Sequence, residues 1–208
     1  MRSRNRLVKG VGINDVDLPT STVINGKVVK DRFYLTWTNM LNRCYSPKYH
    51  ETRPTYAGCT VCDEWLYFSK FKAWMEQQDW EGKHLDKDLL IGGNRIYSPN
   101  TCLFVASQVN SSLMLNGVNR GDYPIGCSFN AVGRNYKAEC YNGCGRKIYL
   151  GYFETPIKAH RAWQGAKISS IDNLKDSQPD FLVKIGLQRI INKIQDDYDN
   201  YRETTNFD

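Results

Sequence analysis

Residues 121–168 constrain the fold most strongly, because their hydrophobic period changes from that of strands to that of a helix. The first half contains three short runs in which apolar residues alternate with others, as in half-buried strands. Both connections between the runs carry the glycine that tight hairpins need, at 131–134 and 142–145. The pattern predicts a meander of three antiparallel strands.

The second half of this stretch predicts a helix. Thr155 suits the N-cap and Pro156 the first helical position. Apolar and mostly small residues then repeat at helical spacing, which lets a helix lie close to a sheet: Ala159, Ala162, Trp163 and Ala166. One face of the meander is therefore expected to pack on this helix.

The opposite face of the meander is expected to be polar and aromatic. Plain alternation assigns to it Ser128, Asn130, Asn135, Lys137, Glu139, Tyr141, Lys147 and Tyr149. Such side chains suit the major groove, where polar groups read base edges and cations hold phosphates. A solvated sheet face without a partner fits the same pattern equally well.

This stretch resembles the AP2/ERF-type DNA-binding domain found in homing endonucleases of bacteriophages and mobile elements. The motifs that carry the resemblance are Tyr123-x-x-Gly126-Cys127-Ser128-Phe129, Tyr136-Lys137-Ala138-Glu139, Leu150-Gly151-Tyr152-Phe153-Glu154-Thr155 and Ala159-x-x-Ala162-Trp163. The resemblance implies that the sheet lies in the major groove of double-stranded DNA. Its contact positions fall on Ser128, Asn130, Glu139, Tyr141, Lys147 and Tyr149, and several of them hold arginine or tryptophan in the family. Lys137, a cation on the same face, completes the set of DNA-binding residues that we expect.

The positive charge is unevenly distributed, in a way that fits a polyanionic partner. The net charge is +6. Residues 120–165 carry seven cations and three anions, and residues 1–32 carry the same numbers. Arginines in the N-terminal arm either track phosphates or keep a frayed terminus soluble: Arg2, Arg4 and Arg6.

The N-terminal third predicts a hairpin followed by two amphipathic helices. Asn25-Gly26 is typical of a hairpin turn. From Asp31 onward, one helical face carries Phe33, Trp37, Met40, Leu41 and Cys44. Thr60-x-x-Asp63 resembles a capping box for a second helix, whose buried stripe would be Trp65, Phe68, Phe71 and Met75.

Residues 83–110 are the candidate for chemistry. Two carboxylates, Asp86 and Asp88, stand at the end of a short strand and are followed by a Gly-Gly-Asn turn and a Ser-Pro-Asn turn. Hard oxygen ligands beside such turns suit Mg²⁺ or Mn²⁺. A hairpin with surface aspartates and turn asparagines explains the composition without any metal.

The same residues are similar, more weakly, to the HNH (ββα-metal) nuclease motif. The resemblance implies that Asp86 and Asn110 hold one divalent metal and that Asn100 braces the loop. The family's general-base histidine position holds Lys87 here, which is protonated at the ordinary lysine pKa of about 10.4. Either Lys87 has a depressed pKa, or His84 acts as the base, or the site is inactive.

Two cysteines, Cys59 and Cys62, have the spacing of a zinc-ligand pair. A structural zinc site needs four ligands, usually in two such pairs. The remaining cysteines and histidines supply no second pair, so we expect reduced thiols rather than zinc. The odd count of seven cysteines also argues against a disulfide framework.

These observations predict an α+β protein with three regions: an HNH-like domain at 1–112, an AP2/ERF-like domain at 120–168 and an amphipathic helix at 179–203. The apolar stripe of the last helix either packs on the body or pairs with a second copy. The leading interpretation is a phage-encoded, metal-dependent DNA endonuclease in the cytoplasm, without membrane contact. The alternatives are an inactive DNA-binding descendant and a protein that binds a host factor.

Overall fold

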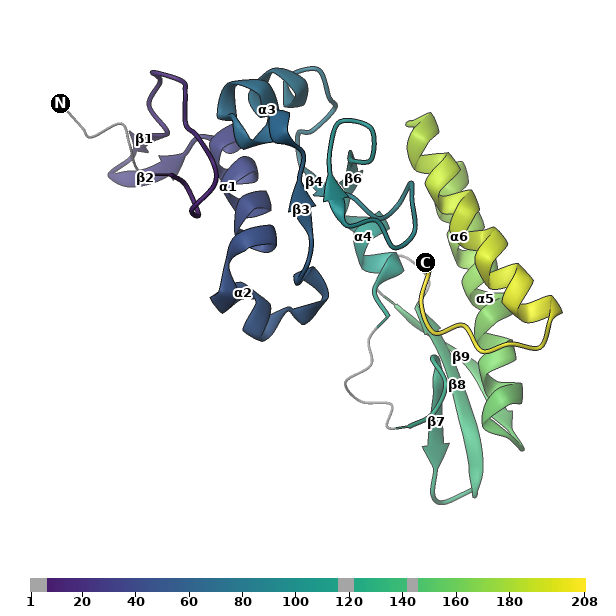
Figure 1. Cartoon of the computed structure of the whole chain (residues 1–208). Coiled ribbons are helices and arrows are strands. Elements are labelled where there is room, and N and C mark those ends of the chain that lie inside the picture. Colours follow the sequence, from purple (N-terminus) through teal and green to yellow (C-terminus); the bar gives the residue numbers. More distant parts are fainter. Residues whose placement is uncertain (1–6, 116–121, 142–145) are drawn as a thin grey trace. The chain divides into compact units, whose positions relative to one another are not determined.

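The computed structural model describes residues 7–115, 122–141 and 146–208, and the chain is a mixture of helices and small sheets. It divides into two compact units (Figure 1). The first comprises Met1–Asp88 and Asn94–Phe104, and the second comprises Leu89–Gly93 and Val105–Asp208. Residues 105–112, assigned from sequence to the HNH-like domain, thus belong to the second unit. No helix of the described residues is long and apolar enough to span a membrane.

The first unit opens with the expected hairpin. Strands β1 (Ser21–Ile24) and β2 (Lys27–Lys30) pair antiparallel, with Ile24 opposite Lys27. Asn25 and Gly26 both have positive φ, as a two-residue turn of this type requires.

Helix α1 (Arg32–Tyr45) forms the centre of the first unit. The Asp31 carboxylate caps it by accepting a hydrogen bond from the Tyr34 amide, at 2.8 Å. Its buried residues are Trp37, Met40, Leu41 and Cys44, four of the five expected from the sequence. Helix α2 (Pro47–Thr52) and the 3₁₀ turn η1 (Pro54–Tyr56) follow it.

The capping box at Thr60 was a wrong prediction, although the apolar stripe was right. Thr60 lies in strand β3 (Thr60–Val61), a 3₁₀ turn η2 (Asp63–Leu66) comes next, and helix α3 (Phe68–Met75) begins only at Phe68. The physical reason is strand pairing, because β3 hydrogen-bonds in parallel with β5 (Ile96–Tyr97). The core contains the whole expected stripe: Trp65, Phe68, Phe71 and Met75.

Strand β4 (Lys83–Asp86) pairs with β6 (Leu103–Ala106), and helix α4 (Ser107–Leu113) follows β6 directly. Leu85 of β4 and Phe104 of β6 are buried in the core of the first unit.

The second unit contains the predicted meander on a helix. Strands β7 (Cys127–Asn130), β8 (Asn135–Tyr141) and β9 (Lys147–Phe153) form an antiparallel sheet in chain order, and helix α5 (Pro156–Asp176) packs on it (Figure 1). Thr155 caps α5 and Pro156 opens it, as expected. The turn expected at 142–145 lies outside the described residues.

A close approach between Gly126 and Trp163 joins the sheet to α5. Gly126 has φ of +78°, and a Cβ atom built on it would lie 2.2 Å from the Trp163 ring. Only glycine fits this position, because any side chain would overlap the Trp163 ring. Ile125 and Cys140 complete this part of the core.

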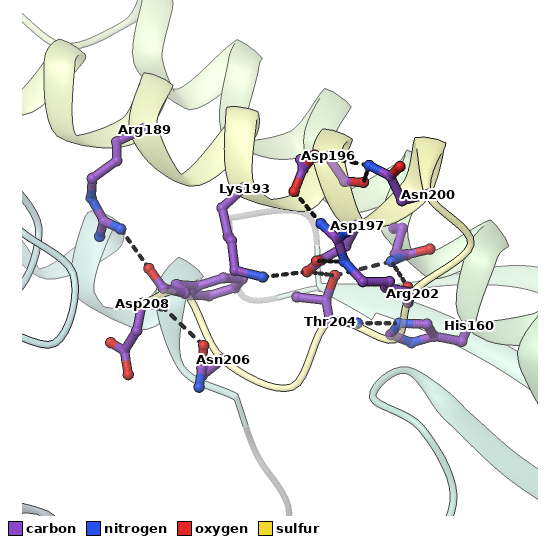
Figure 2. A network of polar contacts seen from close by, with 12 residues as sticks. His160, Arg189, Lys193, Asp196, Asp197, Asn200, Arg202, Thr204, Asn206 and Asp208 are labelled. Atoms are coloured by element: carbon purple, nitrogen blue, oxygen red, sulfur yellow. Dashed lines mark hydrogen bonds and ion pairs between the residues drawn. The ribbon is translucent and has the colours of Figure 1, made fainter.

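Helix α6 (Phe181–Asp199) packs along α5 and buries most of its apolar stripe: Leu187, Ile190, Ile191 and Ile194. Its N-cap is Asp180. The segment after α6 folds back along both helices (Figure 2). The Thr204 amide donates to Nε2 of the buried His160 at 3.0 Å, so that Nδ1 carries the proton and donates to the Ile125 carbonyl at 2.7 Å. This segment is therefore part of the second unit's packed structure.

Candidate functional site

The outer face of the sheet is the face turned away from α5, and the strand register defines it. Ser128 lies opposite Lys137, Asn130 opposite Asn135, and Glu139 opposite Tyr149. Paired residues in antiparallel strands share a face, and residues two apart along a strand share it too. All eight residues that alternation assigned to this face lie on it, together with a ninth: Ser128, Asn130, Asn135, Lys137, Glu139, Tyr141, Lys147, Tyr149 and Tyr152.

Tyr152 reaches the outer face because the ladder shifts register between Ala138 and Glu139. Ala138 pairs with Gly151, whereas Glu139 pairs with Tyr149, so Leu150 is an extra residue in β9. Gly151 accommodates the irregularity with φ of +120°. Beyond this bulge the alternation of β9 is reversed. Tyr152 therefore stands opposite Lys137, with its ring centroid 5.5 Å from that of Tyr149.

Glu139 connects the two lysines of the outer face. One carboxylate oxygen lies 2.7 Å from Lys137 Nζ and the other lies 3.4 Å from Lys147 Nζ. The hydrogen bond from Lys137 is the main reason that the pKa of Glu139 is lowered, and it outweighs the opposing effect of burial. The same bond raises the pKa of Lys137. Both shifts favour the charged forms of Glu139 and Lys137.

The remaining side chains of this face present rings and amides to solvent. Tyr141 and Tyr149 are 41% and 53% exposed, and Lys147 Nζ lies 5.7 Å from the centre of the Tyr141 ring. Asn130 donates a hydrogen bond to the Asn135 side chain at 2.9 Å. The face thus offers cations, amides, a hydroxyl and aromatic rings on one twisted surface.

In the candidate chemical loop, Lys87 is a buried hydrogen-bond donor. It is 6% exposed, its ammonium forms an ion pair with Asp88, and it donates to the Asn94 carbonyl at 2.6 Å. The Tyr97 ring centre lies 5.9 Å from Nζ. The ammonium is therefore held by partners from its own loop. The geometry favours a structural role for Lys87, and its service as a general base stays a prediction.

Asn94 braces this loop and is the residue that the sequence analysis missed. Its amide donates to the carbonyls of Lys87 and Ile96, each at 2.8 Å, and its oxygen accepts from the Ile96 amide at 3.1 Å. Asn100, expected in the bracing role, is exposed in the following turn. The sequence contains the Gly-Gly-Asn turn, but Asn100 matches the family motif, and the motif therefore predicted the bracing role for Asn100.

The other expected site residues lie on two elements, β4 and α4. His84 is exposed on β4 and Asp86 is half-buried at its end, where its carboxylate accepts from the Asp88 amide at 2.9 Å. Asn110 is half-buried on α4 of the second unit. Within the described residues, there is no group of three or more His, Cys, Asp and Glu side chains that could hold a metal ion.

The cysteines of the described residues are free thiols, and most are buried. Burial raises the pKa of Cys44 and of Cys102 to about 12, and it also raises the pKa of Cys62. Cys59 precedes strand β3 and is buried in the core of the first unit, and Cys62 is partly buried against the same core.

Comparison of the chain with models of protein families, with curated proteins and with solved structures gives no match.

Proposed function

We propose that this protein binds double-stranded DNA through the outer face of the β7–β8–β9 sheet. The observation that carries the proposal is the strand register, which gathers two lysines, four further polar residues and three tyrosines on one face. Lysines hold phosphates without regard to sequence, whereas amides, hydroxyls and rings can contact base edges and thymine methyl groups. A sheet face of this composition supports both kinds of contact.

The distribution of charge supports the same partner. Residues 120–165 carry seven of the chain's 28 cations but only three of its 22 anions. Lys137 and Lys147 are 35% and 52% exposed at their side chains, which leaves both within reach of a polyanion. Electrostatic attraction of this kind supplies most of the affinity of a protein for DNA of any sequence.

The test is the salt dependence of binding to a duplex of random sequence. We expect the double variant Lys137→Ala/Lys147→Ala to bind about tenfold more weakly and to flatten the log–log salt slope by about 1–2, because two phosphate contacts are lost. Lys158→Ala/Lys175→Ala is the matched control, since it removes two lysines that pair with acids on or beside α5. Equal slopes in the two double variants would place the DNA-binding surface elsewhere.

A second candidate function is metal-dependent cleavage of DNA. The specific observation in its favour is that β4 pairs with β6 and that α4 follows β6 directly, with Asp86 at the end of β4. The donors that the motif supplies are the Asp86 carboxylate and the Asn110 amide oxygen. Hard oxygens of this kind fit Mg²⁺ or Mn²⁺, which retain several water ligands.

In this second function each residue has a definite task. The metal would supply a positive charge that stabilises the phosphate oxygens during hydrolysis. Lys87 would hold the loop through Asp88 and Asn94, and His84, which is exposed beside Asp86 on the same strand, would accept the proton of the attacking water.

Incubation of supercoiled plasmid with the protein and Mg²⁺ or Mn²⁺ tests this function, with EDTA as the metal-free control. We expect Asp86→Ala to abolish nicking while it leaves folding and DNA affinity unchanged. Wild-type protein that binds DNA but nicks nothing with either ion would refute the nuclease and leave the DNA-binding proposal standing.

A further inference from the structure

We propose that helix α6 and the segment after it form a clasp that holds residues 89–93 and thereby positions the candidate chemical loop between β4 and β5. The inference deepens the second candidate function, metal-dependent cleavage, and its effect on cleavage rests on that function. The clasp consists of Gly186, Arg189, Phe207 and Asp208. All four lie outside the stretches that resemble known families.

Residues 89–93 belong to a different unit from their neighbours in the chain. Leu89–Gly93 are part of the second unit, whereas the chain up to Asp88 and the chain from Asn94 to Phe104 belong to the first. The candidate chemical loop is therefore connected covalently to the second unit at both ends of this short stretch. Contacts that hold residues 89–93 also limit the positions open to the residues on either side.

The first half of the clasp is the part of α6 around Gly186 and Arg189. A Cβ atom built on Gly186 would lie 2.8 Å from the Leu89 carbonyl oxygen and 2.5 Å from Leu89 Cγ, so Leu89 rests on the helix backbone itself. Arg189 Nε donates a hydrogen bond to the same carbonyl at 3.2 Å. Glycine disfavours helices, and here it stands where the loop approaches most closely.

The second half of the clasp is the pair Phe207 and Asp208. Arg189 reaches from α6 toward this pair, and its Nη1 donates to the Phe207 carbonyl at 2.6 Å (Figure 2). The Asp208 carboxylate accepts from the Gly93 amide at 2.9 Å, and a Cβ atom built on Gly92 would lie 2.8 Å from Asp208 Cα. One guanidinium thus binds both the loop and the segment that lies against it.

The segment that carries this pair is anchored in the core of the second unit. The Thr204 amide donates to His160 and the Thr204 hydroxyl donates to Asp197, each at 3.0 Å. The Gln164 amide donates to the same hydroxyl at 3.0 Å. His160, Gln164 and Asp197 are at most 2% exposed. The clasp is therefore fixed at its base by buried groups, independently of the loop that it holds.

Without the clasp, the loop would depend on the hydrogen bonds at its own base, between Lys87 and Asn94. Asp86 stands directly before those bonds and would sample more positions. A reacting group must be held close to its productive geometry, so a looser loop lowers kcat. The KM for DNA should not change, because the binding surface that we propose is the sheet.

The experiment measures hydrogen exchange of the full chain by mass spectrometry and compares Arg189→Met with Arg161→Met. Arg161 is the matched control, because its guanidinium also donates to a backbone carbonyl of α6, that of Tyr198 at 2.7 Å. We expect Arg189→Met to speed exchange in peptides that cover residues 86–96 about tenfold, since it removes a charged donor from two carbonyls. Arg161→Met should leave those peptides unchanged, and equal exchange there in the two variants would overturn the inference.

A second variant guards against a general loss of stability in Arg189→Met. Asp208 is exposed, so Asp208→Ala should fold normally and speed exchange in the same peptides about threefold. Unchanged exchange in Asp208→Ala, together with faster exchange throughout the second unit in Arg189→Met, would overturn the inference.

Plasmid nicking with Mg²⁺ or Mn²⁺ then tests the effect on cleavage. We expect Arg189→Met to lower kcat about tenfold without a change in KM, and a change in KM alone would overturn the positioning role. Wild-type protein that nicks nothing would refute the second candidate function, whereas the exchange measurements would still decide whether the clasp holds the loop.

Discussion

The two units each contain a lysine paired with a carboxylate, in very different surroundings. In the first unit, Lys87 has a side chain that is 8% exposed and is held by Asp88 and the Asn94 carbonyl. In the second, Lys137 and Lys147 share Glu139 on an open sheet, with side chains 35% and 52% exposed. The residue types are the same, but the exposure of the lysine side chains to water differs greatly.

This difference teaches which of the two lysine groups is available to a ligand. A buried cation that loses its acceptors cannot be solvated, so its pair holds the loop together. An exposed pair is worth little to folding, because water and salt screen it, and a phosphate can displace the carboxylate at small cost. Burial therefore favours a structural role for Lys87, whereas exposure leaves Lys137 and Lys147 available to the DNA partner that we propose.

The largest effect should follow from removal of the buried lysine. We expect Lys87→Met to lower the free energy of unfolding by about 2–3 kcal/mol, because the Asn94 carbonyl and the Asp88 carboxylate lose their donor. The loss is smaller than for a fully buried pair, since Asp88 is 54% exposed at its side chain. Urea unfolding followed by tryptophan fluorescence measures it.

Lys83→Met is the control for that measurement. Lys83 pairs at 2.6 Å with Asp79, whose side chain is 75% exposed, and it begins β4, the strand that ends just before Lys87. Such a pair contributes about 0–1 kcal/mol. Similar losses for the two variants would show that burial does not distinguish them, and the contrast between the two lysine groups would fail.

A buried carboxylate of the second unit extends the comparison. It tests whether the contribution of a charged group to folding depends on its burial or on the unit in which it lies. Asp197 is 2% exposed and accepts hydrogen bonds from Lys193 at 2.6 Å, Thr204 at 3.0 Å and Arg202 at 3.2 Å (Figure 2). Burial opposes its charge, but these three hydrogen bonds outweigh that effect and hold its pKa below the usual range.

We expect Asp197→Asn to destabilise the second unit by about 1–2 kcal/mol at pH 7. A lowered pKa in the folded state stabilises the protein above the unfolded-state value of about 3.9, and this contribution is lost as the pH falls through the lower folded-state pKa. The difference between wild type and variant should therefore shrink between pH 5 and about pH 2.

Asp172→Asn provides the exposed counterpart, since Asp172 pairs with Lys175 at 2.7 Å with a side chain that is 54% exposed. Thermal unfolding of both variants at pH 7 and at pH 3 makes the comparison. A variant at Asp197 that is as stable as the one at Asp172 would mean that the network around Thr204 contributes nothing to folding.

The sequence predicted the second unit better than the first. The meander, the capped helix and the shared face of eight residues follow from short-range alternation and from local turn chemistry, which the chain itself carries. Strand β3 could not be predicted in this way. Its partner β5 lies 36 positions further along at Thr60 and Ile96, and a two-residue strand has no period of its own.

The candidate chemical loop shows a second limit of sequence reasoning. Asp86, Lys87 and Asn100 were assigned by their order in a motif, but bracing depends on which carbonyls face which amide. Asn94 makes those hydrogen bonds because it closes the loop between β4 and β5 at a Gly-Gly turn. The motif spacing favours Asn100, and only the folded backbone shows that Asn94 makes the bracing hydrogen bonds.

Tyr152 shows how one extra residue alters an otherwise correct assignment. Plain alternation along β9 turns Tyr152 toward α5, whereas the bulge at Leu150 turns it outward beside Tyr149. Tyr152 is 51% exposed, which leaves it accessible to a ligand of the outer face. If the outer face binds DNA, this ring should lie against the duplex together with Tyr149.

We expect the smallest effect from Tyr152→Ala, a loss of about fivefold in affinity for DNA, equivalent to about 1 kcal/mol. The reason is the loss of ring contact with a base or sugar, and since no charge is removed, the salt slope should not change. Tyr67→Ala is the control, because Tyr67 is 44% exposed but belongs to the first unit. Fluorescence anisotropy at two salt concentrations measures both quantities. Equal affinity of the two variants would mean that DNA does not reach the part of the sheet beyond the bulge, and would restrict the binding surface to the cations and amides around Glu139.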